Sequence, residues 1–126
     1  MILSILAAIV IGSASCSAED GIVVLSPQDF VSQAKADTSA VILDVRTPAE
    51  YDEGHLEGAK QLDYLNTEVF DAGMKSLDKA NTYYIYCRSG RRSHGACEKM
   101  KSQGFKVFDM EGGYLNWTKQ GLQVVK

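Results

Sequence analysis

The residues best suited to chemistry are Cys87 and the polar loop that follows it. Cys87 opens the segment Cys-Arg-Ser-Gly-Arg-Arg-Ser, residues 87–93, directly after the apolar run 83–86. A helix-compatible stretch, 93–103, comes next, so the cysteine is expected where a buried strand ends and a helix begins. Open α/β sheets bind their ligands at junctions of this kind. The thiol is therefore a candidate nucleophile at a binding site.

The loop itself favours the binding of an anion. Its serine and glycine are small, so the backbone can turn tightly and point successive N–H groups inward, and the start of the next helix adds further unpaired N–H groups. Its three arginines are positive in a chain whose net charge is −3. We expect this setting to favour the thiolate of Cys87, the nucleophilic form. The alternative is that Cys87 packs as a small buried apolar side chain. The predicted anion-binding residues are Arg88, Ser89, Gly90, Arg91, Arg92 and Ser93.

Three motifs resemble those of the single-domain rhodaneses, the thiosulfate sulfurtransferases. Residues 87–93 are similar to the active-site loop of that family, 43–51 and 54–59 to its N-terminal signature, and 112–117 to its C-terminal signature. The resemblance covers about residues 22–121. It implies a rhodanese-like domain, an α/β fold with a mainly parallel five-stranded sheet and helices on both faces.

The periodicity of the chain agrees with that architecture. The predicted strands are 22–25, 40–43, 59–62, 83–86 and 105–110, and the predicted helices start at Ser26 and Thr47 and cover 66–77, 93–103 and a short segment around 114–117. Strands that alternate with helices predict an α/β fold with a mainly parallel sheet. A length of 126 residues suits a single domain.

Several other polar residues invite a role in the site. Asp44 ends a predicted strand, so it could hydrogen-bond the amides of the cysteine loop, and Arg46 could pair with Glu50. The favoured interpretation is that both Asp44 and Arg46 are structural and fix the loop. His55 is interpreted as a structural hydrogen-bonder, because a thiolate that is already ionised needs no general base. Cys97 is expected in the core, with a resolving thiol for Cys87 as the alternative.

The length of the loop separates two kinds of cysteine chemistry. Sulfur transfer and phosphate-ester hydrolysis both use a cysteine within a ring of amides beside a helix start. In the phosphatase pattern an arginine stands six places after the cysteine, but here Ser93 stands there and Arg92 stands five places after. The shorter loop resembles that of the sulfurtransferases. A Cys-dependent phosphatase or arsenate reductase is therefore the less favoured alternative.

The resemblance implies a thiosulfate sulfurtransferase that works by double displacement. A small anionic donor such as thiosulfate would load a persulfide onto Cys87, and cyanide, a thiol or a thiol-carrying protein would remove the sulfur with ping-pong kinetics. No cofactor is expected, and the two histidines and three cysteines show no metal-ligand spacing. The mildly acidic composition gives no reason to expect nucleic-acid binding. A persulfide carrier and a non-catalytic rhodanese-like binding module remain alternatives.

The first 18 residues differ from the rest. Residues 1–11 are almost all apolar, small residues follow, and no charge occurs before Glu19. This pattern predicts a signal peptide or lipoprotein signal over 1–18, an exported domain over 19–126, and a periplasmic or membrane-anchored location. Cys16 is a candidate lipidation site and membrane tether, because 13–16 resembles a loose lipobox. Two features depart from these patterns: the basic segment that usually begins a signal is missing, and Ser13 replaces the usual leucine.

Overall fold

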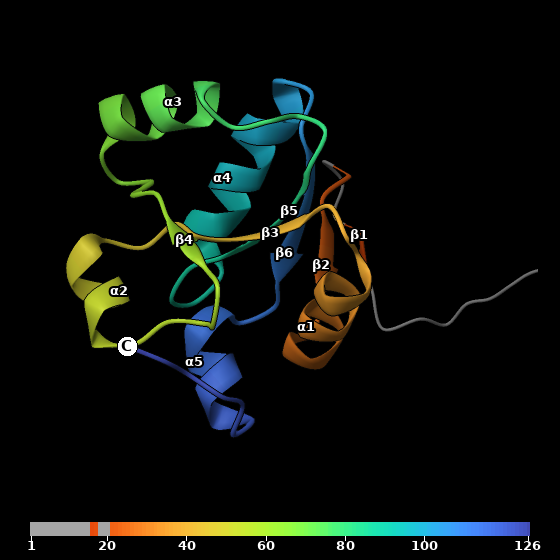
Figure 1. Ribbon diagram of the computed structural model, residues 1–126, viewed down its shortest axis with the longest axis vertical. Coiled ribbons are helices and arrows are strands. Elements are labelled where there is room, and N and C mark those ends of the chain that lie inside the picture. The colour runs from red at the N-terminus through yellow and green to blue at the C-terminus, as the bar shows by residue number, and fades with distance from the viewer. Residues whose placement is uncertain (1–15, 18–20) are drawn as a thin grey trace, which may run out of the picture.

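The computed structural model describes residues 16–17 and 21–126 (Figure 1). The predicted signal segment 1–18 lies outside the described residues except for Cys16 and Ser17, which form the short strand β1. Export and lipidation of Cys16 therefore stay predictions. Within the described ranges, no helix has both the length and the apolar character needed to span a bilayer.

A single sheet with the strand order β1-β2-β6-β5-β3-β4 forms the centre of the fold. Five strands run parallel, and these are β2 (Val23–Leu25), β6 (Lys106–Met110), β5 (Thr82–Tyr86), β3 (Ala40–Asp44) and β4 (Lys60–Gln61). They coincide with the five predicted apolar runs to within two residues at either end. The sequence pattern did not predict β1 (Cys16–Ser17), which pairs antiparallel with β2.

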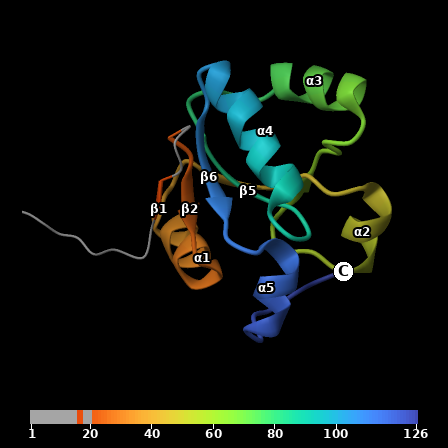
Figure 2. The same cartoon turned by 180° about the vertical axis from the view of Figure 1, so that it is seen from behind.

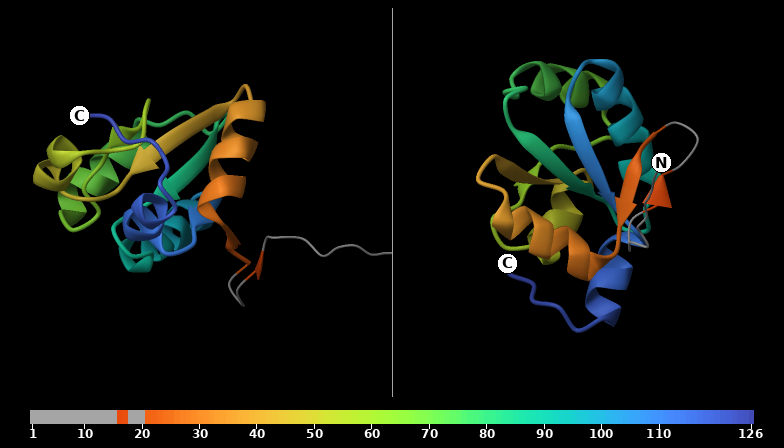
Figure 3. Two further views of the ribbon diagram at one scale, coloured as in Figure 1. Left: turned by 90° about the horizontal axis from the view of Figure 1, so that it is seen from below. Right: turned by 90° about the vertical axis from the view of Figure 1, so that its right-hand side faces the viewer.

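Helices cover both faces of the sheet, as predicted (Figures 1 and 2). The helices α3 (Thr67–Lys75) and α4 (Arg91–Ser102) lie on one face, and α1 (Pro27–Ala36) and α5 (Gly113–Lys119) lie on the other (Figure 3). The short helix α2 (Pro48–Glu53) lies beyond the edge strand β4.

The central strand β5 is buried on both faces. Tyr83 and Ile85 pack in the core beneath α3 and α4, whereas Tyr84 and Tyr86 pack in the core beneath α1 and α5. This explains why the run 83–86 shows no alternation of apolar and polar residues. Cys87 continues the α4-facing side of the strand.

Side-chain caps fix the starts of two helices as predicted. The hydroxyl of Ser26 accepts a hydrogen bond from the N–H group of Asp29, and Thr47 and Glu50 form a reciprocal capping box at α2. The predicted start of α4 at residue 93 is wrong by two residues. Gly90 adopts a left-handed conformation with φ of 105° and caps the helix, which therefore begins at Arg91.

Candidate active site

Cys87 lies at the predicted junction, directly after β5 and before the loop that starts α4. The residue is 1% exposed, and its Sγ atom accepts a hydrogen bond from the N–H group of Gly90 at 3.1 Å. Among the predicted anion-binding residues of the loop, Gly90 provides the amide that is seen to donate to the sulfur. The amides of Arg91 to Ser93 belong to the first turn of α4, where N–H groups have no partner within the helix.

The N-terminus of α5 holds the other side of the cysteine loop. Tyr114 donates its N–H group to the carbonyl of Cys87 at 2.8 Å, and Leu115 donates to the carbonyl of Arg88 at 3.0 Å. Gly113 makes this approach possible, because a Cβ atom there would lie 2.6 Å from both carbonyl oxygens. Sequence reasoning missed the contact of this segment with the loop; the Gly112-Gly113 pair was the available signal.

The three arginines of the loop have two different environments. Arg92 makes a bidentate ion pair with Glu50 of α2, with N–O distances of 2.8 and 3.0 Å. Hydrogen bonding from Arg92 lowers the pKa of Glu50 to about 2. Arg88 and Arg91 are exposed, and neither side chain makes a hydrogen bond or ion pair within the described ranges. These two side chains are available for an anion from solvent.

Arg92 lies within electrostatic reach of the sulfur although it is paired elsewhere. Its hydrogen bond with Glu50 raises its pKa above the usual value, and the negative charge of a Cys87 thiolate adds a smaller effect in the same direction. The guanidinium thus supports a negative sulfur while it ties α4 to α2. Its role as a direct substrate ligand stays a prediction, because both hydrogen bonds that its guanidinium makes in the described part of the chain go to Glu50.

Asp44 is buried beside the strand that carries Cys87, but its partners differ from those expected. Its carboxylate binds the guanidinium of Arg46 at 2.6 and 2.9 Å and accepts the hydroxyl of Tyr86 at 2.6 Å. Asp44 is therefore not seen to bond the loop amides, and Arg46 pairs with Asp44 and not with Glu50. The favoured interpretation, that Asp44 and Arg46 are structural, agrees with this geometry.

The Asp44–Arg46 pair connects several elements around the site. The Arg46 guanidinium also donates to the carbonyl of Gly54 at 2.7 Å and lies 4.2 Å from the ring centre of Tyr114. Burial, followed by the nearby Asp44 charge, raises the pKa of Tyr86, so its hydroxyl stays protonated as a donor. The pair thus supports both β5 and the start of α5.

His55 and Cys97 have structural surroundings. The His55 ring stacks on Tyr51 with 3.6 Å between ring centres, and its Nδ1 atom lies 2.8 Å from the Tyr51 carbonyl. The chain around His55 also pairs with Val125 through two backbone hydrogen bonds. Cys97 is fully buried within the core under α4, as predicted. The structure does not bring either residue into the cysteine loop.

Sequence reasoning missed Asp109, a buried carboxyl on the α4 side of β6. It is 3% exposed, and its Oδ2 atom lies 3.7 Å from Nδ1 of His94. Burial raises the pKa of Asp109 to about 6, although hydrogen bonding from Ser93 opposes the shift. Its signal in the sequence is that it is the one acid within the apolar run 105–110.

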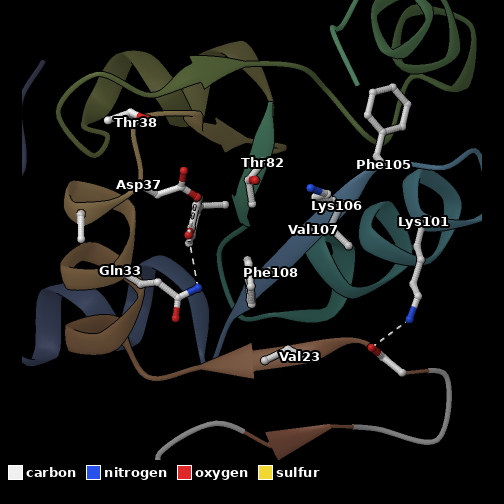
Figure 4. A pocket seen from close by; sticks show the side chains of 13 residues that line it. Val23, Gln33, Asp37, Thr38, Thr82, Lys101, Phe105, Lys106, Val107 and Phe108 are labelled. Carbon is white, nitrogen blue, oxygen red and sulfur yellow. Dashed lines mark hydrogen bonds between the residues drawn. The ribbon is translucent and has the colours of Figure 1, made fainter. Parts of the chain in front are cut away.

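A cavity of about 790 Å³ lies at the far end of the sheet (Figure 4). Its lining includes Val23, Thr82 and Lys106, which begin β2, β5 and β6, whereas Cys87 follows the opposite end of β5. This cavity is therefore separate from the reactive thiol.

The fold and the loop together define a class: α/β domains that hold a buried cysteine in a strand-to-helix loop with backbone donors. The chain matches the family described as Rhodanese-like domain over residues 26–120. It therefore belongs to the rhodanese family.

Individual relatives agree with this assignment. A protein named sulfurtransferase from Allochromatium vinosum is 39% identical over 99 residues, which cover 77% of this chain and 90% of the relative. The protein named thiosulfate sulfurtransferase GlpE from Pseudomonas fluorescens is 37% identical over 87 residues, which cover 68% of this chain and 77% of the relative. The crystal structure of a rhodanese-related protein from Thermoplasma volcanium has a TM-score of 0.71 at 27% identity and covers 80% of this chain and 95% of that one.

Proposed function

We propose that this protein is a thiosulfate sulfurtransferase, which moves sulfane sulfur from thiosulfate or a similar anionic donor to a thiol or cyanide. One observation carries the proposal: the Cys87 sulfur lies at the end of β5 with the Gly90 N–H group directed at it. The exposed side chains of Arg88 and Arg91, which have no ion partner in the part of the chain that the structure describes, can attract the donor anion. The similarity to a relative named for thiosulfate supports this choice of donor.

The reaction proceeds through a persulfide. The Cys87 thiolate attacks the outer sulfur of thiosulfate, a new S–S bond forms, and the S–S bond of thiosulfate breaks so that its electron pair leaves with sulfite. The persulfide carries the negative charge on its terminal sulfur, where backbone N–H groups of the loop stabilise it. An acceptor thiolate or cyanide then attacks that sulfur, and Cys87 leaves as the thiolate.

The environment of Arg92 also argues against phosphate-ester hydrolysis. In the phosphatase pattern the arginine stands six residues after the cysteine. Here Arg92 stands one residue too early and binds Glu50 with two hydrogen bonds. A phosphate would have to compete with that carboxylate for the same N–H groups.

Mass spectrometry of the whole protein after exposure to thiosulfate tests the proposal. We expect the mass to rise by one sulfur atom, with the added atom mapped to Cys87, and to return to the starting value after cyanide is added. Two-substrate initial rates should then give parallel double-reciprocal lines. Loading without steady turnover would instead indicate a persulfide carrier, and no sulfur adduct would indicate a binding module or phosphatase.

The double variant Arg88→Ala/Arg91→Ala tests the role of the two unpaired cations. We expect kcat/KM for thiosulfate to fall about 10-fold to 100-fold, mainly through KM, and the salt dependence of the wild-type rate to flatten, because the anion loses its electrostatic attraction. Initial rates at two salt concentrations provide the measurement. The matched control is Lys119→Ala, because Lys119 is exposed at the far end of α5. This variant should leave kcat/KM and its salt dependence unchanged. Equal KM values in the double variant and the wild type would contradict this role.

A further inference from the structure

Ser93 lies between the cysteine loop and the buried carboxyl of Asp109. It is fully buried in the first turn of α4, and its hydroxyl donates to the carbonyl of Gly90 at 3.2 Å. Hydrogen bonding from Ser93 lowers the pKa of Asp109, although burial outweighs this effect, so the two side chains are neighbours. The Oδ1 atom of Asp109 is buried and has no hydrogen-bond partner within the described part of the chain.

When Asp109 is ionised, the Ser93 hydroxyl has one proton to donate but two acceptors beside it. A serine hydroxyl carries a single proton, and a carboxylate can only accept. The Gly90 carbonyl and the Asp109 carboxylate then compete for the one proton of Ser93. A protonated Asp109 removes the conflict, because it can donate to Ser93 Oγ while Ser93 donates to Gly90.

We propose that Asp109 is a positioning residue whose proton controls the cysteine loop through Ser93 and Gly90. In the protonated form, the chain of donors from Asp109 to Ser93 to the Gly90 carbonyl fixes Gly90, whose own N–H group donates to Cys87 Sγ. In the ionised form, Ser93 turns to Asp109, and the Gly90 carbonyl keeps only the N–H group of His94. The effect on rate rests on the proposed sulfur transfer, but the hydrogen-bond change does not.

The titratable neighbours of Asp109 set the pH at which the loop would respond. Burial raises the pKa of this carboxyl to about 6, and Ser93 and His94 oppose the shift. His94 faces it from α4 and also lies 4.0 Å from Glu98. The residues paired with Asp109 on β2 and β5 are Val24 and Ile85, which do not titrate. The change should therefore fall near pH 6, where the Asp109 carboxyl titrates.

Backbone NMR of the full chain between pH 5 and pH 8 separates the two groups. We expect the amide shift of Gly90 to titrate with a midpoint near pH 6 in the wild type. The titration should disappear in Asp109→Asn, whose amide donates permanently to Ser93, and in Ser93→Ala, but should persist in His94→Gln. Persistence in Asp109→Asn with loss in His94→Gln would assign the effect to the histidine and overturn the proposal, as would a wild-type Gly90 amide that does not titrate.

The rate of sulfur loading from thiosulfate gives the second readout. We expect Asp109→Asn and the wild type to react at similar rates at pH 5, and the variant to be about threefold to tenfold faster at pH 8, where the wild-type carboxyl is ionised. A ratio that does not change with pH would contradict control of the loop by the Asp109 proton. If neither protein loads sulfur, the proposed function fails while the Gly90 titration still decides on the hydrogen-bond change.

Discussion

A Cys87→Ser variant is expected to lose sulfur transfer by at least about a thousandfold. A serine hydroxyl is not ionised near neutral pH, and oxygen cannot form the persulfide on which double displacement depends. The side chain is 1% exposed and hydrogen-bonded to Gly90, so serine can occupy nearly the same place and the fold should be retained. The measurement is thiocyanate formation from thiosulfate and cyanide, with far-UV circular dichroism to verify folding.

Cys97→Ala is the matched control for this experiment. Cys97 is the other cysteine in residues 21–126, and it is fully buried in α4, away from the loop. We expect most of the activity to remain. Loss of transfer in Cys97→Ala together with its survival in Cys87→Ser would show that the wrong cysteine has been assigned.

Asp44→Ala is expected to lower the free energy of unfolding by about 3–5 kcal/mol. The substitution leaves the guanidinium of Arg46, itself 3% exposed, without its counter-charge, and removes the acceptor of the Tyr86 hydroxyl. Breaking a buried pair from one side costs this much because an uncompensated charge remains in the interior. Urea unfolding followed by circular dichroism provides the measurement.

Two further variants make the Asp44 result specific. Asp44→Asn keeps an acceptor of similar shape but removes the charge. Its loss in the free energy of unfolding should therefore lie between those of the wild type and Asp44→Ala. Asp52→Ala, on the exposed side of α2, should change stability by less than about 0.5 kcal/mol. If Asp44→Ala is within about 1 kcal/mol of the wild type, the buried pair does not support the site as described.

Local patterns predicted most of the architecture. The apolar runs gave the five parallel strands, because strands covered on both faces are continuous in hydrophobicity. Ser26 and Thr47 predicted two helix starts, because a cap acts within three residues of the chain. The start of α4 was misplaced, because the left-handed conformation of Gly90 follows from the loop as a whole and not from its immediate neighbours.

The partners of the site residues were harder to predict. Arg92 and Glu50 pair across α4 and α2, and nothing in the separation of these residues along the chain indicates that contact. Arg46 stands four residues before Glu50 but instead binds Asp44, because its side chain turns inward to the buried carboxylate. Asp109 could have been noticed as a lone acid in an apolar strand, whereas its contact with Ser93 depends on how α4 packs on β6.

The contact between α5 and the cysteine loop determines which face of that loop is electron-poor. The described peptide bonds are all trans, and in a trans peptide the carbonyl and the following N–H group point in opposite directions. Since α5 captures the carbonyl oxygens of Cys87 and Arg88, the amide protons of Arg88 and Ser89 must be directed away from that helix. The carbonyl oxygens of Cys87 and Arg88 are thereby turned toward α5 and engaged there. The final helix thus gives the loop its polarity although it contributes no reacting atom.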